Sequence, residues 1–242
     1  MTVTDVNVVK SAIFERPDDA NKGTLGSLLC VCGSYGMAGA AVMSAKGALR
    51  TGIGLAKCAL PRSIYPIVAQ TILESVYYPL SENADGRISK VNVPFLVSES
   101  SKSSATLVGC GLGVCDDTLK IVFSLIENST TPLVLDADAL NCVAKQPEIL
   151  LRKKVPIIIT PHPGEMSRLT GLATPLVNAE RERVALDFAQ KYGVVTVLKG
   201  AGTVIASPNG KVLVNPTGNS GMATGGSGDV LAGMTASILA QG

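Results

Sequence analysis

The sequence predicts an α/β fold in which a mostly parallel sheet lies between two layers of helices. Short apolar runs, typical of strands buried on both faces, alternate with segments whose apolar residues recur at helical spacing. Pro208-Asn209-Gly210 separates the last two apolar runs and has the composition of a hairpin turn. We therefore expect three layers, α/β/α, with a β-hairpin near the C-terminal end.

The elements of the first half follow from apolar runs that end at glycine or proline. We predict strands at 27–32, 55–60 and 74–78, and helices at 40–50 and 64–70. The polar stretch 81–90 contains Asp85-Gly86 and is typical of an exposed turn.

The second half alternates more regularly. We predict strands at 105–108, 132–135, 156–160, 194–198, 203–207 and 211–215, and helices at 116–127, 178–192 and 230–239, with a further short helix ending near Gly171. Ligands of parallel sheets bind beyond the carboxyl ends of the strands. The segments 33–39, 109–113, 136–138, 162–165 and 199–203 all follow strands, so we expect them at one edge of the sheet.

Length and composition place residues 1–242 in one domain with a large core. Hydrophobic residues make up 46% and charged ones 17%, which excludes a disordered chain. The net charge of +2 comes from scattered basic residues, so we expect no nucleic-acid surface. No apolar run is long enough for a membrane span and no signal pattern precedes the domain, so we expect a cytoplasmic protein that does not bind membranes.

The cysteines are expected to be reduced and buried. All six lie in or beside apolar stretches, and Cys30 and Cys32 alternate along one strand so that both point to the same face. One histidine and no CxxC pair leave no ligand set for a metal held by protein side chains.

The most informative segment is 216–234. Five glycines fall within residues 218–228, and a helical pattern follows, so free backbone N–H groups can face a phosphate. Asp229 lies at the junction. A carboxylate repels phosphate, so it could instead take a proton from a hydroxyl that attacks phosphorus, or it could be a plain N-cap.

The run from Asn219 through Gly221-Met222-Ala223-Thr224-Gly225-Gly226-Ser227-Gly228-Asp229 to Gly233 resembles the signature of the ADP/ATP-dependent NAD(P)H-hydrate dehydratases. These enzymes belong to the ribokinase-like superfamily, whose members share a G-x-G-D anion hole. The similarity extends from residue 22 to 233 and implies a ribokinase-like fold. Relatives continue with further helices, so we expect either that the C-terminal helices are truncated here or that the tail is unusually short, and we expect no fused epimerase domain.

The resemblance assigns roles to individual residues. The K-G-A-G-T run formed by Lys199, Gly200, Ala201, Gly202 and Thr203, together with Gly228, matches the nucleotide contacts of the family, although a simple turn with an exposed lysine has the same composition. His162 in T-P-H-P-G-E matches a substrate contact, although a lone histidine is often structural. Glu165 could start a helix or help to order magnesium and water.

Gly113, Ala41 and Asp229 are the other substrate positions that the resemblance implies. Gly113 ends a G-x-G-L-G loop, and Ala41 follows the loop Met37-Ala38-Gly39. The spacing of 109–113 does not fit a dinucleotide-binding Rossmann fingerprint. Asp136 and Asp138 also lie in a segment similar to the family, where helix capping is one explanation and their role stays open.

The function that the resemblance implies is repair of NAD(P)H. The enzyme would be a lyase that dehydrates (S)-NADHX and (S)-NADPHX, the hydrated forms of NADH and NADPH, and would consume ADP or ATP with Mg²⁺. Asp229 would be the catalytic base toward the C6 hydroxyl. The family also suggests a homo-oligomer, such as a tetramer. The alternatives are a ribokinase-type kinase of a vitamin precursor or sugar alcohol and a non-catalytic nucleotide-binding module.

Overall fold

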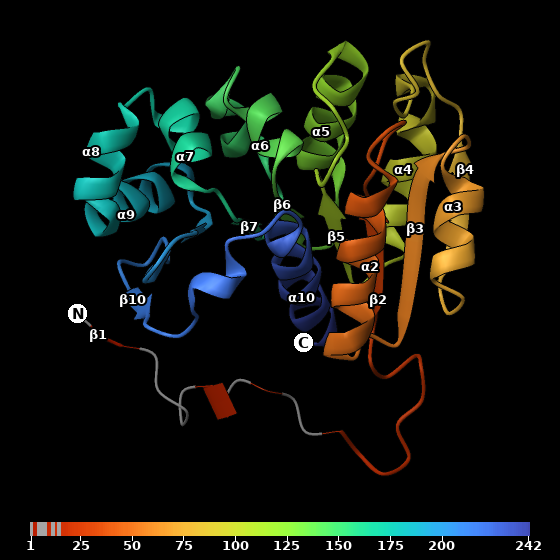
Figure 1. Ribbon diagram of the computed structural model, residues 1–242, viewed down its shortest axis with the longest axis horizontal. Coiled ribbons are helices and arrows are strands. Elements are labelled where there is room, and N and C mark those ends of the chain that lie inside the picture. The colour runs from red at the N-terminus through yellow and green to blue at the C-terminus, as the bar shows by residue number, and fades with distance from the viewer. Residues whose placement is uncertain (1, 4–8, 11–12, 14–15) are drawn as a thin grey trace.

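The computed structural model describes residues 2–3, 9–10, 13 and 16–242, which form one ten-stranded sheet with helices on both faces (Figure 1). The strand order is β1-β10-β9-β8-β7-β6-β5-β2-β3-β4. The strands are β1 (Thr2–Val3), β2 (Ser27–Val31), β3 (Leu55–Pro61), β4 (Val76–Leu80), β5 (Ala105–Val108), β6 (Leu133–Leu135), β7 (Ile157–Ile159), β8 (Val195–Leu198), β9 (Thr203–Ala206) and β10 (Val212–Asn215). Strands β2 to β8 pair in parallel, and β8, β9 and β10 are antiparallel, so the expected hairpin is confirmed.

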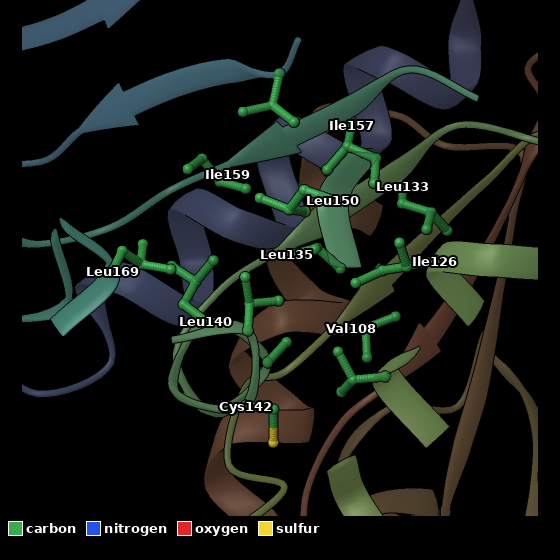
Figure 2. Close-up of a cluster of buried hydrophobic side chains, with 14 of the residues drawn as sticks. Val108, Ile126, Leu133, Leu135, Leu140, Cys142, Leu150, Ile157, Ile159 and Leu169 are labelled. Carbon is green, nitrogen blue, oxygen red and sulfur yellow. The ribbon is translucent and has the colours of Figure 1, made fainter. Parts of the chain in front are cut away.

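Two separate cores fill the space between the sheet and its two helical layers. One layer contains α2 (Ala38–Thr51), α3 (Tyr65–Thr71) and α10 (Ser227–Gln241). The other contains α4 (Val93–Ser101), α5 (Asp116–Asn128), α6 (Asp138–Val143), α7 (Pro163–Thr170), α8 (Thr174–Ala179) and α9 (Arg181–Tyr192), with the 3-10 helix η2 (Pro147–Arg152). Figure 2 shows part of this second core, where side chains of β5, β6 and β7 meet those of α5, α6 and η2.

Strand β2 shows why a continuous apolar run forms a central strand. Leu28 and Cys30 face the core of α2 and α10, while Leu29 and Val31 face the core of α5. Each of these four side chains is therefore removed from water in one core or the other. This burial on both faces is what stabilises a parallel sheet covered by helices on both sides. β2 pairs with β3 on one side and β5 on the other, so the chain changes winding direction here, and ligands of such sheets bind at this point.

Helix α10 packs against α2 through glycines (Figure 1). A Cβ at Gly47 would lie 2.6 Å from the carbonyl oxygen of Val230, and a Cβ at Gly233 would overlap the carbonyl oxygen of Ser44. The two backbones can approach this closely only because neither position carries a side chain. This contact fixes where the N-terminus of α10 lies relative to α2.

Several elements differ from the sequence prediction. Helix α10 begins at Ser227 rather than Val230, and the predicted helix 178–192 is two helices that meet at Glu180, whose ψ of 41° breaks the helical path. Helices α4 and α6 were not predicted, because α4 is rich in serine and α6 is only 6 residues long. None of the helices in the described part of the chain combines the length and apolar character needed to cross a lipid bilayer.

Substitution of Gly233 by alanine tests the α2–α10 contact. We expect Gly233→Ala to lower the free energy of unfolding by about 1–3 kcal/mol, because the new methyl group forces two backbones apart. Thermal unfolding measures the change. The control is Gly39→Ala in α2, where a Cβ would meet nothing closer than 4.0 Å, so stability should be equal or higher. Equal melting temperatures for wild type and Gly233→Ala would contradict this account of the packing.

Candidate functional site

Asp229 occupies the third position of α10, at the carboxyl-end edge of the sheet. The N-cap of this helix is Gly226, whose φ of 92° requires glycine. Asp229 is therefore not the N-cap, which was one of the two roles that the sequence allowed for it. Its carboxylate is partly buried, and a carboxylate oxygen of Asp136 and the thiol of Cys110 lie with it within 4.8 Å of one another. The first turn of α10 therefore places a carboxylate beside a second carboxylate.

The surroundings raise the pKa of Asp229. Burial is the largest cause, and the carboxylates of Asp136 and Asp138 add to it, while the thiol of Cys110 and the ammonium of Lys199 act in the opposite direction. A carboxylate with a raised pKa is a stronger base once it is ionised. Such a group is suited to accept a proton from a hydroxyl.

Lys199 and Asp136 form a buried ion pair below the start of α10. The Lys199 Nζ atom lies 2.7 Å from Asp136 Oδ1, and Asp136 is only 2% exposed. The hydroxyl of Thr160 donates to the same oxygen at 2.8 Å. A Cβ at Gly228 would lie 3.5 Å from the ammonium, so glycine there leaves the charge accessible to a ligand at the helix N-terminus. The geometry suits an anion held by Lys199 and backbone N–H groups.

His162 is the N-cap of α7 and forms a capping box with Glu165. The Nδ1 atom accepts the N–H of Gly164 at 3.0 Å, and Glu165 Oε2 accepts the N–H of His162 at 2.7 Å. Since Nδ1 is an acceptor, the neutral ring carries its proton on Nε2, and half of the side chain is exposed. His162 therefore caps the helix and still leaves half of its imidazole exposed to a ligand. Glu165 does start a helix, as one of its two interpretations stated.

Glu165 also faces the ion pair. Its Oε2 atom lies 3.8 Å from Lys199 Nζ, and the side chain is 6% exposed. Burial raises its pKa most, whereas Lys199 and the bonded N–H of His162 lower it. Lys199 is therefore shared by two buried carboxylates, and its position is held from two elements, β6 and α7.

The loop from Lys199 to Thr203 lies beside a cavity of about 690 Å³. Ala201 and Gly202 line it together with residues 178–183 of α8 and α9 and with Val204 and Val214. Arg181 shapes the loop from below, since its Nη2 atom donates to the carbonyls of Leu198 at 2.8 Å and Lys199 at 3.1 Å. The segment that the sequence predicted to bind nucleotide thus borders this cavity through Ala201 and Gly202.

Gly113 and Ala41 lie on the opposite side of Asp136. The N–H of Gly113 donates to Asp138 Oδ2 at 2.8 Å. This bond brings the loop next to the acidic cluster, by which we mean Asp136, Asp138 and Asp229. Ala41 is 2% exposed and packs below Gly33, where a Cβ would lie 3.0 Å from the Ala41 methyl group. Its contact with substrate stays a prediction that its burial does not favour.

Sequence reasoning missed the Cys110 contact and left the role of Asp136 open. Both residues follow strands, β5 and β6, so their position at the edge of the sheet was the available signal. A second signal exists only in three dimensions: Ala137 has φ of 49°, the one positive φ among the described residues other than glycine. Strained backbone of this kind concentrates at functional sites.

The donor set indicates which cation the site suits. Cys110, Asp136 and Asp229 together offer a thiol and two carboxylates, a set closer to the preference of Zn²⁺ than of Mg²⁺. Magnesium prefers oxygen ligands and retains several waters. The carboxylates of Asp136 and Glu165 fit Mg²⁺ in that manner, together with phosphates of a ligand.

Comparisons with known proteins point to one family of enzymes. The family model described as NAD(P)H-hydrate dehydratase matches residues 28–242. A bifunctional NAD(P)H-hydrate repair enzyme from Moorella thermoacetica is 39% identical over 233 residues, covering 96% of this chain and 44% of the relative. The ADP-dependent (S)-NAD(P)H-hydrate dehydratase of Neisseria meningitidis is 36% identical over 230 residues, covering 94% and 73%.

Solved structures show the same fold. The ADP/ATP-dependent NAD(P)H-hydrate dehydratase of Bacillus subtilis, co-crystallised with ATP and Mg²⁺, is 31% identical with a TM-score of 0.83, covering 99% of this chain and 81% of that one. A ribokinase-like protein of Enterococcus faecalis, 24% identical, has a TM-score of 0.85 over 99% and 80% of the two chains and confirms the ribokinase-like fold alone. The chain spans less than half the length of the bifunctional relatives.

The Lys199–Asp136 pair makes a prediction about stability. Asp136→Ala leaves the Lys199 ammonium, which is 18% exposed, without its main partner, so we expect the free energy of unfolding to fall by roughly 3–5 kcal/mol. The value should lie near the lower limit, because Glu165 still faces the ammonium. Urea unfolding measures it. The control is Asp85→Ala, which breaks a surface pair and should change stability little. Equal losses in both variants would contradict the pairing.

The pH dependence of activity makes a second prediction. If the ionised form of Asp229 acts as the base, kcat/KM should fall as pH drops through its raised pKa, above the value of about 3.9 for an ordinary aspartate. Asp138→Asn should move this acidic limb to lower pH, because it removes one of the charges that raise the pKa. A limb at the ordinary value in the wild type would contradict the electrostatic account.

Proposed function

The chain belongs to the NAD(P)H-hydrate dehydratase family, and on that premise we propose that it dehydrates hydrated NADH and NADPH at the expense of ADP or ATP. One observation carries the proposal: the carboxylate of Asp229 lies at a helix N-terminus whose first turn also faces the Lys199 ammonium. The carboxylate that would act as the base and the ammonium that would bind phosphate are thus both next to the N-terminus of α10. Phosphoryl transfer to a hydroxyl needs both.

The nucleotide binds along the loop from Lys199 to Thr203. The cavity bordered by Ala201 and Gly202 accepts the nucleoside, and the terminal phosphates extend toward Gly228 and Lys199. The glycines of this loop allow a ligand close to the backbone, and α10 contributes free N–H groups. A Bacillus subtilis relative with this fold was co-crystallised with ATP and Mg²⁺, which supports a nucleotide site in this chain.

Asp229 performs the proton transfer. Its carboxylate takes the proton of the C6 hydroxyl, and the oxygen attacks the terminal phosphorus, so that an O–P bond forms while the bond from phosphorus to the nucleotide breaks. The N–H groups at the start of α10 and the Lys199 ammonium stabilise the charge on the transferred group. Phosphate then leaves C6, a proton leaves C5, and the C5–C6 double bond of the dihydropyridine returns.

Mg²⁺, when bound, neutralises phosphate charge during this transfer. Asp136 and Glu165 are the residues that would hold it through its bound waters, since their oxygens already have partners in Thr160, Cys110 and His162. Lys199 is already shared by these two carboxylates, so the pair also keeps the ammonium from combining with Asp229. The base is then free to reach the hydroxyl.

The nicotinamide end of the substrate lies between Asp229, His162 and Gly113. The half-exposed imidazole of His162 offers an Nε2–H donor on a side chain fixed by its capping bonds. Gly113, which has no side chain, places its backbone beside Asp138 of the acidic cluster. A homo-oligomer and a cytoplasmic location stay predictions of the family resemblance, testable by sedimentation and by localisation.

Asp229→Asn tests the function. We expect ADP and ATP to bind within a few-fold of wild type, because the nucleotide contacts remain, while kcat falls by roughly 10²–10⁴ as the general base is lost. The measurement is recovery of the absorbance of reduced nicotinamide from the hydrate. Near-normal turnover would remove the assignment of the base. If the wild type phosphorylated other alcohols and left the hydrate unchanged, a small-molecule kinase would be the better conclusion.

A further inference from the structure

The polar stretch 81–90 forms a rigid turn beside the loop of Gly113. Asn83 Oδ1 accepts the N–H groups of Asp85 at 3.0 Å and Arg87 at 3.1 Å, and the N–H of Gly86 donates to the Asn83 carbonyl at 3.0 Å. The Asn83 amide in turn donates to Asp117 at 2.9 Å. The backbone of this turn is therefore held in one conformation, as a binding surface requires.

Arg87 lies against the proposed substrate loop. A Cβ at Gly113 would be 2.5 Å from Arg87 Nε, so glycine is needed for the guanidinium to rest there. The other side of Gly113 bonds to Asp138, so this loop separates the arginine from the acidic cluster. The ion pair of Arg87 with Asp85 is a single 3.4 Å contact at the surface and is easily replaced.

Tyr35 lies beside the same turn. Its backbone N–H donates to the Gly86 carbonyl at 2.9 Å, and a Cβ at Gly86 would overlap the Tyr35 Cβ. The preceding Ser34 hydroxyl donates to the Gly111 carbonyl at 2.7 Å, which fixes this loop to that of Gly113. The side chain of Tyr35 nevertheless leaves the residue 73% exposed. These contacts hold the main chain of an exposed tyrosine against Gly86, the residue that precedes Arg87.

We propose that Tyr35 and Arg87 bind the adenosine diphosphate half of the hydrated dinucleotide. The inference rests on the proposed function, because the nicotinamide end at Asp229 and Gly113 directs the rest of the substrate past Arg87. The guanidinium donates to the pyrophosphate with the planar geometry that phosphate oxygens favour. The Tyr35 ring stacks on the adenine, as aromatic rings do on exposed bases.

The test compares hydrated NADH with hydrated, reduced nicotinamide riboside, which has neither phosphate nor adenosine. We expect Arg87→Met and Tyr35→Ala each to raise KM for hydrated NADH about tenfold, the loss of one charge-assisted bond or one stacked ring, with kcat nearly unchanged. Neither variant should change kcat/KM for the riboside. The control is Arg152→Met, which breaks a surface pair with Glu127 elsewhere and should behave as wild type.

A binding measurement separates the two proposals. NADH, the product, carries the same adenosine diphosphate, so its affinity without ADP or ATP should fall about tenfold in both variants, whether or not the enzyme turns over. Wild type that binds NADH through Arg87 but does not dehydrate the hydrate would refute the proposed function alone. Unchanged KM and unchanged NADH affinity in folded Arg87→Met and Tyr35→Ala would refute the inference alone.

Discussion

The ion pair between Lys199 and Asp136 is the interaction on which the site depends. It joins residues 63 positions apart in the chain, at the ends of two strands separated by β7, and Thr160 from the end of β7 donates to the same carboxylate. A buried ammonium is costly unless oxygens surround it, so these three strand ends are constrained to keep their register. The result is a positive charge fixed near the N-terminus of α10, while Asp229 forms no ion pair with any residue that the structure describes.

The parallel part of the fold was predictable because its strands are buried on both faces. Runs such as Leu133–Leu135 and Ile157–Ile159 carry only apolar side chains, and this apolar character alone marks them as strands. Helix boundaries were less predictable where tertiary contacts decide them. The break at Glu180 occurs within an otherwise helical pattern, and α4 forms from a serine-rich segment because Leu96 packs into the core.

Some residues at the carboxyl-end edge of the sheet were predictable, but the contacts between them were not. Glycine density and position after strands indicated Asp229, Lys199 and Gly113, because such residues meet at one edge of a parallel sheet. Which carboxylate would hold Lys199 depends on distances across several strands, and no local pattern encodes them. His162 shows the same limit: its flanking prolines suggested a fixed backbone, whereas its role as a helix cap appears only once Gly164 and Glu165 are in place.

The glycine contact between α2 and α10 has a mechanical consequence. Helix α2 starts directly after the loop that carries Tyr35, and Asp229 lies in the first turn of α10, so the contacts at Gly47 and Gly233 join the Tyr35 loop to Asp229. Sliding either helix alone would drive carbonyl oxygens into opposing main chain. Helices α2 and α10 must therefore move together, and any movement around a bound ligand has to involve the turns at the edge of the molecule instead.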